Sequence, residues 1–597
     1  MAFTDLQSFL DHLEANGELH RISVPVDPEL EITEIATRSV LEGGPALLFE
    51  QVKGSPYPLV INVLASRRRI EMSLGTEPEE LGERLLHFVQ DMNPPSLKAI
   101  WRNRSMARRM MKFRPGRTRR APVQEVVESS PDLGTLPILK CWPGDGGRFL
   151  TLPLVHTVDQ DTGVRNIGVY RMHVYDARTT GMHIQIQRGG GVHHWQAERR
   201  DRPLEVAVAL GGDPALWIAS VAALPEGFDE AAFAGFLRNA RTPMTRAATL
   251  DMDVPARAEF VLEGVVPPHV RRLEGPFGDH FGHYSEAAEF PVFELKTITR
   301  RRNPIYPATV VGKPPQEDKF IGDATQEVLK PLARLIHPEL TDMWAYFEAG
   351  FHNLLVVSVE TRYEREPMKT ALGLLGTGQL ALTKVMVLVD PDVNVRSFAQ
   401  VVKAIRRNFE VEQDLQVIAR APLDTLDFTA GVIDYGGAIG HGGAPHGGGK
   451  LIIDATGRGS SPNAAVALPG DLAAIAPGVT RSRFVEQTLL VVQVESEPRR
   501  ALESLVASPL LSRVKMIAVV SPDVDIDDDT ALLWGIFTRF DPAQDIVFTG
   551  AELRGPVPAY SGVMGIDASL KTSYPRPLEM DPDVIRKVDR RWGEYFA

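Results

Sequence analysis

The sequence predicts a multidomain protein of mixed α and β structure: an N-terminal α/β domain, a central domain of antiparallel strands that forms a roll or barrel, and a C-terminal α/β domain with an internal repeat. Three observations support this prediction. The chain has 597 residues, more than one hydrophobic core can organise. Its outer parts alternate helical and strand patterns, whereas its middle part alternates side-chain types with period two. We place the domains at residues 1–118, 119–320 and 321–597.

Helical periodicity and short apolar runs alternate in the N-terminal domain. Thr4 and Gln7 have the spacing of a capping box before a helix that Gly17 ends. The same periodicity predicts helices over residues 31–41 and 78–92, the latter with a proline at its start, where a missing N–H costs nothing. Apolar runs predict strands at 46–49 and 59–62. This domain shows no candidate chemistry.

The central domain is predicted from period-two strands, and one of them carries an arginine. The strands are expected over residues 167–175, 181–187, 259–266 and 290–299. Arg171 interrupts an otherwise apolar strand. A buried arginine needs an anionic partner, which is either a protein carboxylate in a structural salt bridge or the carboxylate of a bound substrate.

A turn in the same domain places two acids close together. Glu274 and Asp279 flank Gly-Pro-Phe-Gly, and His280 and His283 follow at once. Two carboxyl groups in different surroundings can divide the roles of acid and base. The alternative is an acidic, glycine-rich turn that is simply solvated. The two histidines first suggest metal ligands as well.

The C-terminal domain repeats itself, with copies at about residues 350–460 and 486–575. Each copy reads as strand, helix, strand ending in Pro-Asp, helix, strand, which is an α/β unit. The matching segments are Leu354–Glu360 and Leu489–Glu495, Lys384–Val393 and Lys515–Val524, and Lys450–Thr456 and Val563–Ser569.

A glycine-rich segment, residues 436–450, lies at the end of the first copy. It fails the Walker pattern, because Ala444 stands at its first glycine and Leu451 follows the lysine. Lys450 can still meet a phosphate as a point charge. His441 and His446 are of a metal-binding type, but histidines in such loops are more often solvated.

Composition limits the classes of function. The net charge of −12 argues against nucleic-acid binding, and the basic run at 102–120 is interpreted as a solvated helix and linker. Cys141 is the only cysteine, so a disulfide within the chain is excluded and a reducing cytoplasm is expected. We expect neither a signal peptide nor a membrane span, and at most a peripheral membrane contact.

Short motifs recur along most of the chain. The most specific are Asn166-Ile-Gly-Val-Tyr-Arg171 and Glu274-Gly-Pro-Phe-Gly-Asp279. The others are Gly17-Glu-Leu-His-Arg-Ile22, Pro25-Val-Asp-Pro28, Leu30-Glu-Ile-Thr-Glu-Ile35, Gly44-Pro-Ala-Leu-Leu-Phe49, Cys141-Trp-Pro143 and Asp581-Pro-Asp583. Together these motifs resemble the UbiD family of decarboxylases, which use prenylated FMN.

The resemblance implies a fold and a set of site residues. The central domain would be a split β-barrel of flavin-reductase type, and the last helix would join subunits into a homo-oligomer. Arg171, Glu274 and Asp279 match the catalytic trio. Asn166 and Glu230 would hold Mn²⁺ (with K⁺ as a further candidate ion), and Gln187 stands where many members have a third, histidine ligand. The positions that match the cofactor lining are Val169, Tyr170, Arg171, His183, Ile184, Gln185, Arg188, Gly189 and Lys450. The second repeat has Val563 in place of Lys450.

The implied activity is non-oxidative decarboxylation of an aromatic or α,β-unsaturated acid, with a flavin prenyltransferase supplying the cofactor. Arg171 would position the substrate carboxylate, the cofactor would serve as electron sink, and Asp279 or Glu274, Asp279 first, would return a proton. The doubled C-terminal unit is similar to that of menaquinone-pathway decarboxylases, which suggests a dihydroxynaphthoate-type substrate. The alternatives are a polyprenyl-hydroxybenzoate decarboxylase, a degradative aryl-acid (de)carboxylase, and a catalytically silent flavin-binding subunit.

Overall fold

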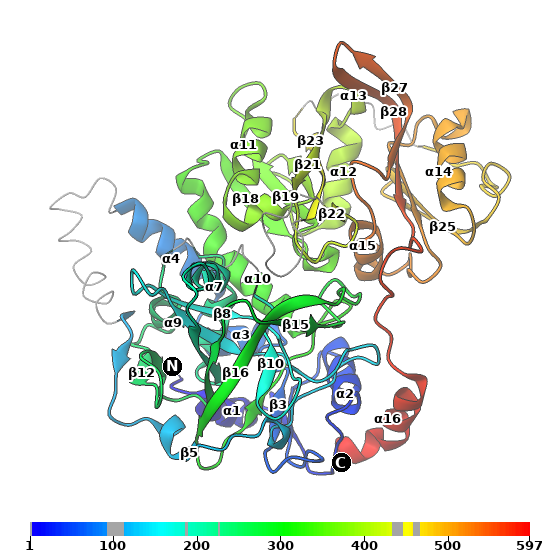
Figure 1. The fold of residues 1–597 in the computed structure, drawn as a ribbon. Helices are drawn as coiled ribbons and strands as arrows, with labels where there is room; N and C mark the ends of the chain where they lie inside the picture. The colour runs from blue at the N-terminus through cyan, green and yellow to red at the C-terminus, as the bar shows by residue number, and fades with distance from the viewer. Residues whose placement is uncertain (1–2, 92–112, 185–188, 225–226, 433–445, 458–465) are drawn as a thin grey trace. The chain divides into compact units, whose positions relative to one another are not determined.

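The structure is a computed structural model that describes residues 3–91, 113–184, 189–224, 227–432, 446–457 and 466–597 (Figure 1). The chain divides into two compact units. The first contains Met1–Leu329 and Arg576–Ala597, and the second contains Lys330–Gly436 and Ala444–Pro575. Most of the basic run and the glycine-rich segment, including His441, lie outside the described residues. Within the described part, no helix combines the length and the apolar character that a bilayer crossing requires.

A small mixed sheet with flanking helices begins the first unit. Its strand order is β1-β2-β3-β17, and β17, from the far end of the central region, pairs in parallel with β3. The helices predicted at 31–41 and 78–92 are confirmed as α2 and α4. The elements are α1 (Leu6–Ala15), β1 (Leu19–Ile22), α2 (Glu31–Leu41), β2 (Ala46–Phe49), β3 (Leu59–Ile61), α3 (Arg67–Leu74), α4 (Pro78–Asp91) and β17 (Tyr306–Pro307).

The capping prediction for the first helix was wrong by one residue. Asp5, not Thr4, is the N-cap of α1, and its carboxylate accepts a hydrogen bond from the backbone N–H of Ser8 at 2.9 Å. Ser8 completes the capping box in place of Gln7. The Gln7 side chain instead reaches the buried Glu259 of the central region, at 2.9 Å.

The central region is an antiparallel sheet with the order β10-β16-β14-β11-β7-β8, and β5 and β15 also pair with β16. The described strands do not close into a barrel, because β8 and β10 end this order. The strands predicted at 259–266 and 290–299 are confirmed as β14 and β16. The strand bounds are β5 (Val126–Glu128), β7 (Leu154–Val158), β8 (Arg165–Val169), β10 (Thr179–Gly181), β11 (Leu204–Leu210), β14 (Phe260–Val266), β15 (Arg271–Glu274) and β16 (Ala288–Arg300).

The single strand predicted at 167–175 is in fact two. β8 ends at Val169 and pairs with β7, whereas β9 (Met172–His173) pairs with β6 (Phe149–Leu150) in a separate ribbon. Tyr170 and Arg171 form the bend between the two pairings. The chain therefore changes sheets at the position of the buried arginine.

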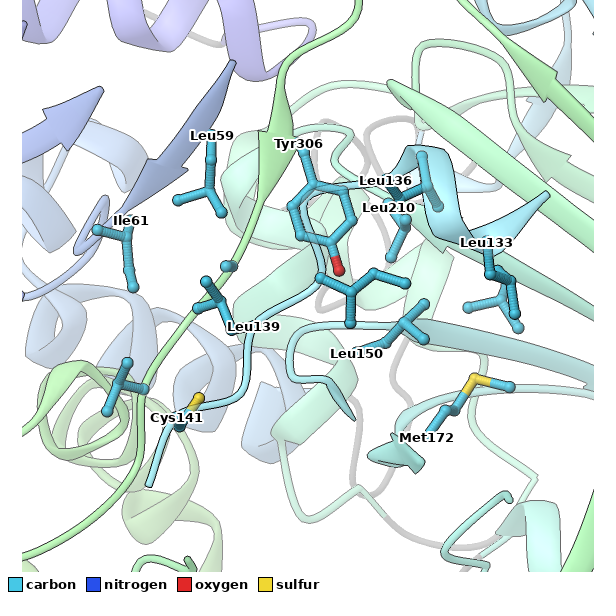
Figure 2. Packing of buried hydrophobic residues seen from close by; sticks show 14 of the residues in the cluster. Leu59, Ile61, Leu133, Leu136, Leu139, Cys141, Leu150, Met172, Leu210 and Tyr306 are labelled. Carbon is cyan, nitrogen blue, oxygen red and sulfur yellow. The ribbon is translucent and has the colours of Figure 1, made fainter. Parts of the chain in front are cut away.

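Apolar side chains from both regions share one core. Figure 2 shows Leu59 and Ile61 of the N-terminal sheet in the same cluster as Cys141, Met172 and Tyr306. All five side chains are buried. A second cluster packs α8 (Pro214–Val221) and α9 (Glu230–Arg238) against the other face of the central sheet. The N-terminal and central regions are thus fixed to each other by a continuous hydrophobic interior.

The second unit contains two sheets of the same topology. The orders are β18-β19-β20-β23-β21 and β24-β25-β26-β28-β27, with antiparallel outer pairs and parallel inner pairs in both. Val385 pairs with Leu451 in the first and Met516 with Met564 in the second, so Lys450 and Val563 occupy equivalent positions. The strands are β18 (Leu340–Ala345), β19 (Leu354–Val359), β20 (Val385–Val389), β21 (Leu415–Pro422), β23 (His446–Ala455), β24 (Val479–Val485), β25 (Leu489–Val494), β26 (Met516–Val520), β27 (Ile546–Arg554) and β28 (Val557–Ala568).

The C-terminal helix α16 (Pro582–Tyr595) belongs to the first unit and contacts α2. The Tyr595 hydroxyl donates a hydrogen bond to the buried Glu31 at 2.7 Å. Lys587 and Arg591 pair with the same carboxylate. This helix is therefore anchored within its own chain, and its expected role in joining subunits stays a prediction.

Candidate active site

Three charged residues from distant parts of the sequence meet in the first unit. Arg171 lies in the bend between β8 and β9. Glu274 ends β15, which β16 holds in register by pairing Glu274 with Ala288. Asp279 follows the turn after β15, and its backbone N–H donates to the carbonyl of His283 at 3.1 Å. Gly275 has φ +91°, a left-handed conformation that favours glycine at the start of this turn.

The Arg171 guanidinium bridges the two carboxylates. Its Nε donates to Oε1 of Glu274 at 2.9 Å, and one terminal nitrogen donates to Oε2 at 3.3 Å. The other terminal nitrogen contacts Asp279, and the Ser285 hydroxyl accepts a further hydrogen bond at 3.0 Å. The ring of Phe277 lies 4.6 Å from the guanidinium carbon. Arg171 is 8 % exposed, so this is a buried, bidentate arrangement.

The arginine keeps both acids ionised. Burial alone would raise the pKa of Glu274, but Arg171 and His183 outweigh it and lower the pKa to about 2. Burial opposes ionisation of Asp279 as well, and the hydrogen bond from His280 together with the charge of Arg171 holds the pKa of that carboxyl well below its usual range. The trio therefore carries an excess negative charge, and neither acid holds a proton at neutral pH.

Two histidines extend the trio. Nδ1 of His183 lies 3.1 Å from Oε2 of Glu274, and its ring stacks on Phe290 at 4.2 Å. Burial and the nearby Arg171 lower the pKa of His183, so it is a neutral donor to Glu274. Nδ1 of His280 lies 2.6 Å from Oδ1 of Asp279.

Asp145 holds the turn between the two acids from behind. Its Oδ1 accepts the backbone N–H of Gly278 at 2.7 Å, and its Oδ2 accepts those of Cys141 and Trp142 at 3.0 and 2.8 Å. A Cβ on Gly146 would lie 2.2 Å from the Gly275 carbonyl oxygen, so glycine is needed for this close approach. Our sequence interpretation missed Asp145, although an acid between glycines after Cys141-Trp-Pro143 was a usable signal.

A second group gathers beside β8. Glu230 begins α9, and its Oε2 accepts the backbone N–H of Ile167 at 3.0 Å. Asn166, the preceding residue, donates to the Tyr170 hydroxyl at 3.3 Å. Helix α7 (Gly189–Arg199) starts here, and a Cβ on Gly189 would lie 2.1 Å from Oδ1 of Asn166. The structure thus brings Asn166, Glu230, Tyr170 and Gly189 together beside β8.

This group suits a metal-linked phosphate. Burial raises the pKa of Glu230 to about 7, which marks a carboxylate without enough positive charge around it. An amide oxygen and a carboxylate are hard ligands for a divalent ion, and a glycine-rich helix N-terminus suits phosphate. Within the described residues, no three His, Cys, Asp or Glu side chains cluster as a metal site. The predicted ligand Gln187 and the predicted cofactor contacts Gln185 and Arg188 lie outside the described residues.

The remaining predicted residues lie in two places. Val169 ends β8 next to Tyr170, and Ile184 is buried shortly after His183. Lys450 belongs to the second unit, where its Nζ donates to the carbonyls of Ala381 and Thr383, both at 2.7 Å. Burial lowers its pKa to about 8. His283 is buried, and its Nδ1 lies 3.1 Å from the Phe281 carbonyl oxygen.

The chain matches three domain models of one family. These are the N-terminal, Rift-related and C-terminal domains of 3-octaprenyl-4-hydroxybenzoate carboxy-lyase, at residues 10–89, at 115–314, and at 319–455 with 472–568. A protein of Archaeoglobus fulgidus is 45% identical over 442 residues, covering 74% of this chain and 91% of that one. A Chlamydia pneumoniae protein, named as a component of 4-hydroxybenzoate decarboxylase, is 36% identical over 595 residues, covering 99% and 98%.

Solved structures show the same fold. Vanillic acid decarboxylase of Sedimentibacter hydroxybenzoicus in its closed form superposes with a TM-score of 0.67 at 27% identity, covering 79% of this chain and 97% of that one. The UbiD-class enzyme HmfF of Pelotomaculum thermopropionicum in complex with FMN gives 0.62 at 27% identity, covering 78% and 98%. The domain models span most of the sequence, and these structures share its architecture: the chain belongs to the UbiD family of carboxy-lyases.

Proposed function

We propose that the protein is a non-oxidative decarboxylase of an aromatic or α,β-unsaturated carboxylic acid and that it uses prenylated FMN. The observation that carries this proposal is the buried Arg171 between Glu274 and Asp279. A purely structural ion pair needs one carboxylate, whereas two ionised acids on one arginine leave an excess negative charge that is costly to bury. Such an arrangement suits proton handling next to a substrate carboxylate.

In this proposal Arg171 orients the substrate carboxylate and Asp279 supplies the proton that replaces it. The trio has an excess negative charge, so a second anion raises the affinity of Asp279 for a proton. Glu274, held by Arg171 and His183, stays ionised and keeps the guanidinium in place. The acid therefore becomes protonated only when substrate is bound.

The cofactor-holding residues would be those beside β8. Asn166 and Glu230 would bind Mn²⁺, and the start of α7 would face the flavin phosphate. The Tyr170 hydroxyl would position the glycines there, since it accepts a hydrogen bond from the Gly190 N–H at 3.1 Å. When bound, prenylated FMN supplies an electron sink for the electrons released with carbon dioxide. We propose that the central sheet corresponds to the split β-barrel of the family and that Lys450, not Val563, reaches the cofactor. The solved HmfF structures with FMN and prFMN support a flavin in this family.

The substrate proposal is a dihydroxynaphthoate-type acid of quinone biosynthesis, supported by the doubled C-terminal unit. Relatives named for vanillic acid and 4-hydroxybenzoate favour the alternative of a smaller aryl acid. Both classes share a carboxylate on an electron-rich aromatic ring, which is the chemistry that Arg171 and Asp279 would serve.

The test is production together with a flavin prenyltransferase, followed by visible absorption and a carbon dioxide release assay. The acids are 1,4-dihydroxy-2-naphthoate, 4-hydroxybenzoate and vanillate, and Arg171→Ala is the negative control. We expect the wild type to bind cofactor and to release carbon dioxide from at least one of these acids. Arg171→Ala should release none. Bound cofactor without release from any of them would favour a silent flavin-binding subunit.

A further inference from the structure

His280 makes a close contact that the proposed roles do not use. Its Nδ1 lies 2.6 Å from Oδ1 of Asp279, and its backbone N–H lies 2.7 Å from the same oxygen. The other oxygen, Oδ2, contacts Arg171. Both oxygens of Asp279 are therefore engaged, one by an arginine and one by a histidine.

This arrangement leaves the source of the proton unexplained. Asp279 is ionised in the free protein, so it must gain a proton before it can donate one. Arg171 does not release protons near neutral pH. Of the two side chains that contact the Asp279 carboxylate in the described part of the chain, His280 is the one that exchanges protons in the physiological range.

The surroundings of His280 lead to a further acid. Its ring lies edge-on to Phe281 at 4.9 Å, and 21 % of its side chain is exposed. Asp318, in the first turn of α10 (Glu317–Leu329), interacts electrostatically with both His280 and Asp279. Burial raises the pKa of Asp318 to about 7, and His280 partly offsets the rise. The charged groups near His280 include Asp279 on its own turn and Asp318 on α10, with Arg171 beyond Asp279.

We propose that His280 is the proton relay of the reaction, passing a proton from its Nδ1 to Oδ1 of Asp279 and recovering one through its other ring nitrogen from water or from Asp318. The inference rests on the proposed decarboxylation. In each turnover the carbon–carboxylate bond breaks, carbon dioxide leaves, and one proton forms the new C–H bond. After each transfer His280 regains its proton, so solvent supplies one proton per turnover and no redox partner is needed.

Substrate binding supplies the driving force. The substrate carboxylate adds a negative charge beside Asp279, and this favours transfer of a proton from His280 onto Asp279. The transfer makes Asp279 a neutral acid and lowers its repulsion with the substrate. The relay therefore delivers its proton only when an acid is present to be decarboxylated.

The test compares His280→Asn, His280→Ala and the exposed control His269→Gln, all loaded with cofactor. An asparagine amide keeps a hydrogen-bond donor close to the place of Nδ1 but cannot pass on a proton. We expect both His280 variants to bind flavin normally, to lose about 10²-fold in kcat, and to change the pH profile of kcat. Added imidazole restores part of the activity of His280→Ala.

The results separate three outcomes. His280→Asn with wild-type kcat and pH profile refutes the relay and leaves only a hydrogen-bonding role. In the protein without cofactor, ¹⁵N-histidine NMR should show a hydrogen-bonded Nδ1–H that disappears in both His280→Ala and Asp279→Asn; its absence in the wild type also refutes the relay. A wild type that binds cofactor but decarboxylates no acid refutes the proposed function and the relay together.

Discussion

The backbone N–H of Gly278 donates a hydrogen bond to the buried carboxylate of Asp145 at 2.7 Å. Gly278 is next to Asp279, so this contact fixes the far end of the turn that starts at Glu274. The other Asp145 oxygen accepts two backbone N–H groups, and burial raises the pKa of Asp145 to about 6. The spacing of the two site acids is therefore set by a third acid that does not contact Arg171 through any hydrogen bond in the described structure.

Replacing Asp145 with alanine should impair catalysis without touching the trio. The variant leaves three buried backbone donors without their acceptor, at a cost of about 1–3 kcal/mol each, and lets Asp279 move relative to Arg171. We expect kcat to fall by about 10²-fold while flavin absorption is retained. Carbon dioxide release and flavin titration measure the two effects.

The matched control is Asp132→Ala. Asp132 also accepts a glycine N–H, that of Gly134 at 2.7 Å, but it is exposed and far along the chain from the site turn. It should leave kcat unchanged. Equal activity of Asp145→Ala and wild type would show that the turn keeps its shape without this anchor.

The ion trio predicts how the loss of stability caused by Arg171→Lys depends on pH. A lysine lacks the planar fork with which Arg171 donates to Glu274 through two nitrogens and to Asp279 through the third. The two buried acids are therefore left incompletely paired, at a cost of about 3 kcal/mol. The folded pKa of Glu274 is about 2, below its unfolded value, so its contribution to stability is present above about pH 4.5 and is lost as the pH falls towards 2. The difference in unfolding free energy between wild type and variant should therefore narrow over that range.

Denaturant unfolding at several pH values measures this difference, with the exposed Arg272→Lys on β15 as control. A difference that stays constant down to about pH 2 would mean that the arginine stabilises the fold by packing alone. Decarboxylation by Arg171→Lys should be lost in either case.

The residues of this site were largely predictable from the sequence because they lie in short motifs. The contacts between those motifs could not be predicted. Arg171, Glu274 and Asp279 were identified from residue types and a resemblance. The flanking glycines mark Asp145 as a candidate, but its contacts, like that of His280, depend on backbone geometry, which side-chain patterns do not encode. The same limit explains the strand predicted through Arg171: periodicity continues across the bend, and only the pairing partners change. It also explains the cap, since Asp5 and Thr4 are both good N-cap types.

The proposed metal site predicts that Glu230→Gln affects thermal stability in opposite directions with and without Mn²⁺. Burial raises the pKa of Glu230 to about 7, so its carboxylate opposes folding at alkaline pH in the metal-free protein. Glutamine keeps an acceptor for the Ile167 N–H and removes that charge. The metal-free variant should therefore be at least as stable as wild type, whereas Mn²⁺ should raise the thermal midpoint of the wild type alone.

Differential scanning fluorimetry at about pH 8 with and without Mn²⁺ makes the comparison, and Glu205→Gln on β11 is the control. Equal stabilisation of Glu230→Gln and wild type by the ion would place the metal elsewhere.

Lys450 and Val563 occupy equivalent positions in the internal repeat, but we expect their substitution to affect flavin binding differently. Burial lowers the pKa of Lys450 to about 8, so its positive charge, and with it any phosphate contact, is lost as the pH rises through that value. We expect Lys450→Met to weaken flavin binding by about tenfold at pH 7, equivalent to about 1.4 kcal/mol. We also expect the wild type to bind flavin more weakly as the pH rises through about 8, and this decline should be absent in Lys450→Met. Val563→Met, at the matching position of the second copy, should change neither the strength of flavin binding nor its dependence on pH. Fluorescence titration with FMN from about pH 6 to 9 tests both, and an unaffected Lys450→Met would assign the contact to another residue.

A buried histidine outside the site makes the fold sensitive to acid. His156 on β7 is 0 % exposed, and among the described residues neither of its ring nitrogens has a hydrogen-bond partner. Burial, and secondarily Arg165, lowers its pKa to about 3. Because the unfolded chain binds this proton at about pH 6.5, the free energy of unfolding is at its full value above that pH and declines by about 1.4 kcal/mol per pH unit as the pH falls towards 3.

His156→Leu removes the proton site and an unpaired polar group at once. It should be more stable than wild type by about 1–3 kcal/mol at pH 7, and by about 2 kcal/mol more at pH 5. The exposed His87→Leu should show neither effect in guanidinium unfolding at the two pH values. If His156→Leu gains nothing on going from pH 7 to pH 5, then His156 is protonated in the folded protein and must have a partner there.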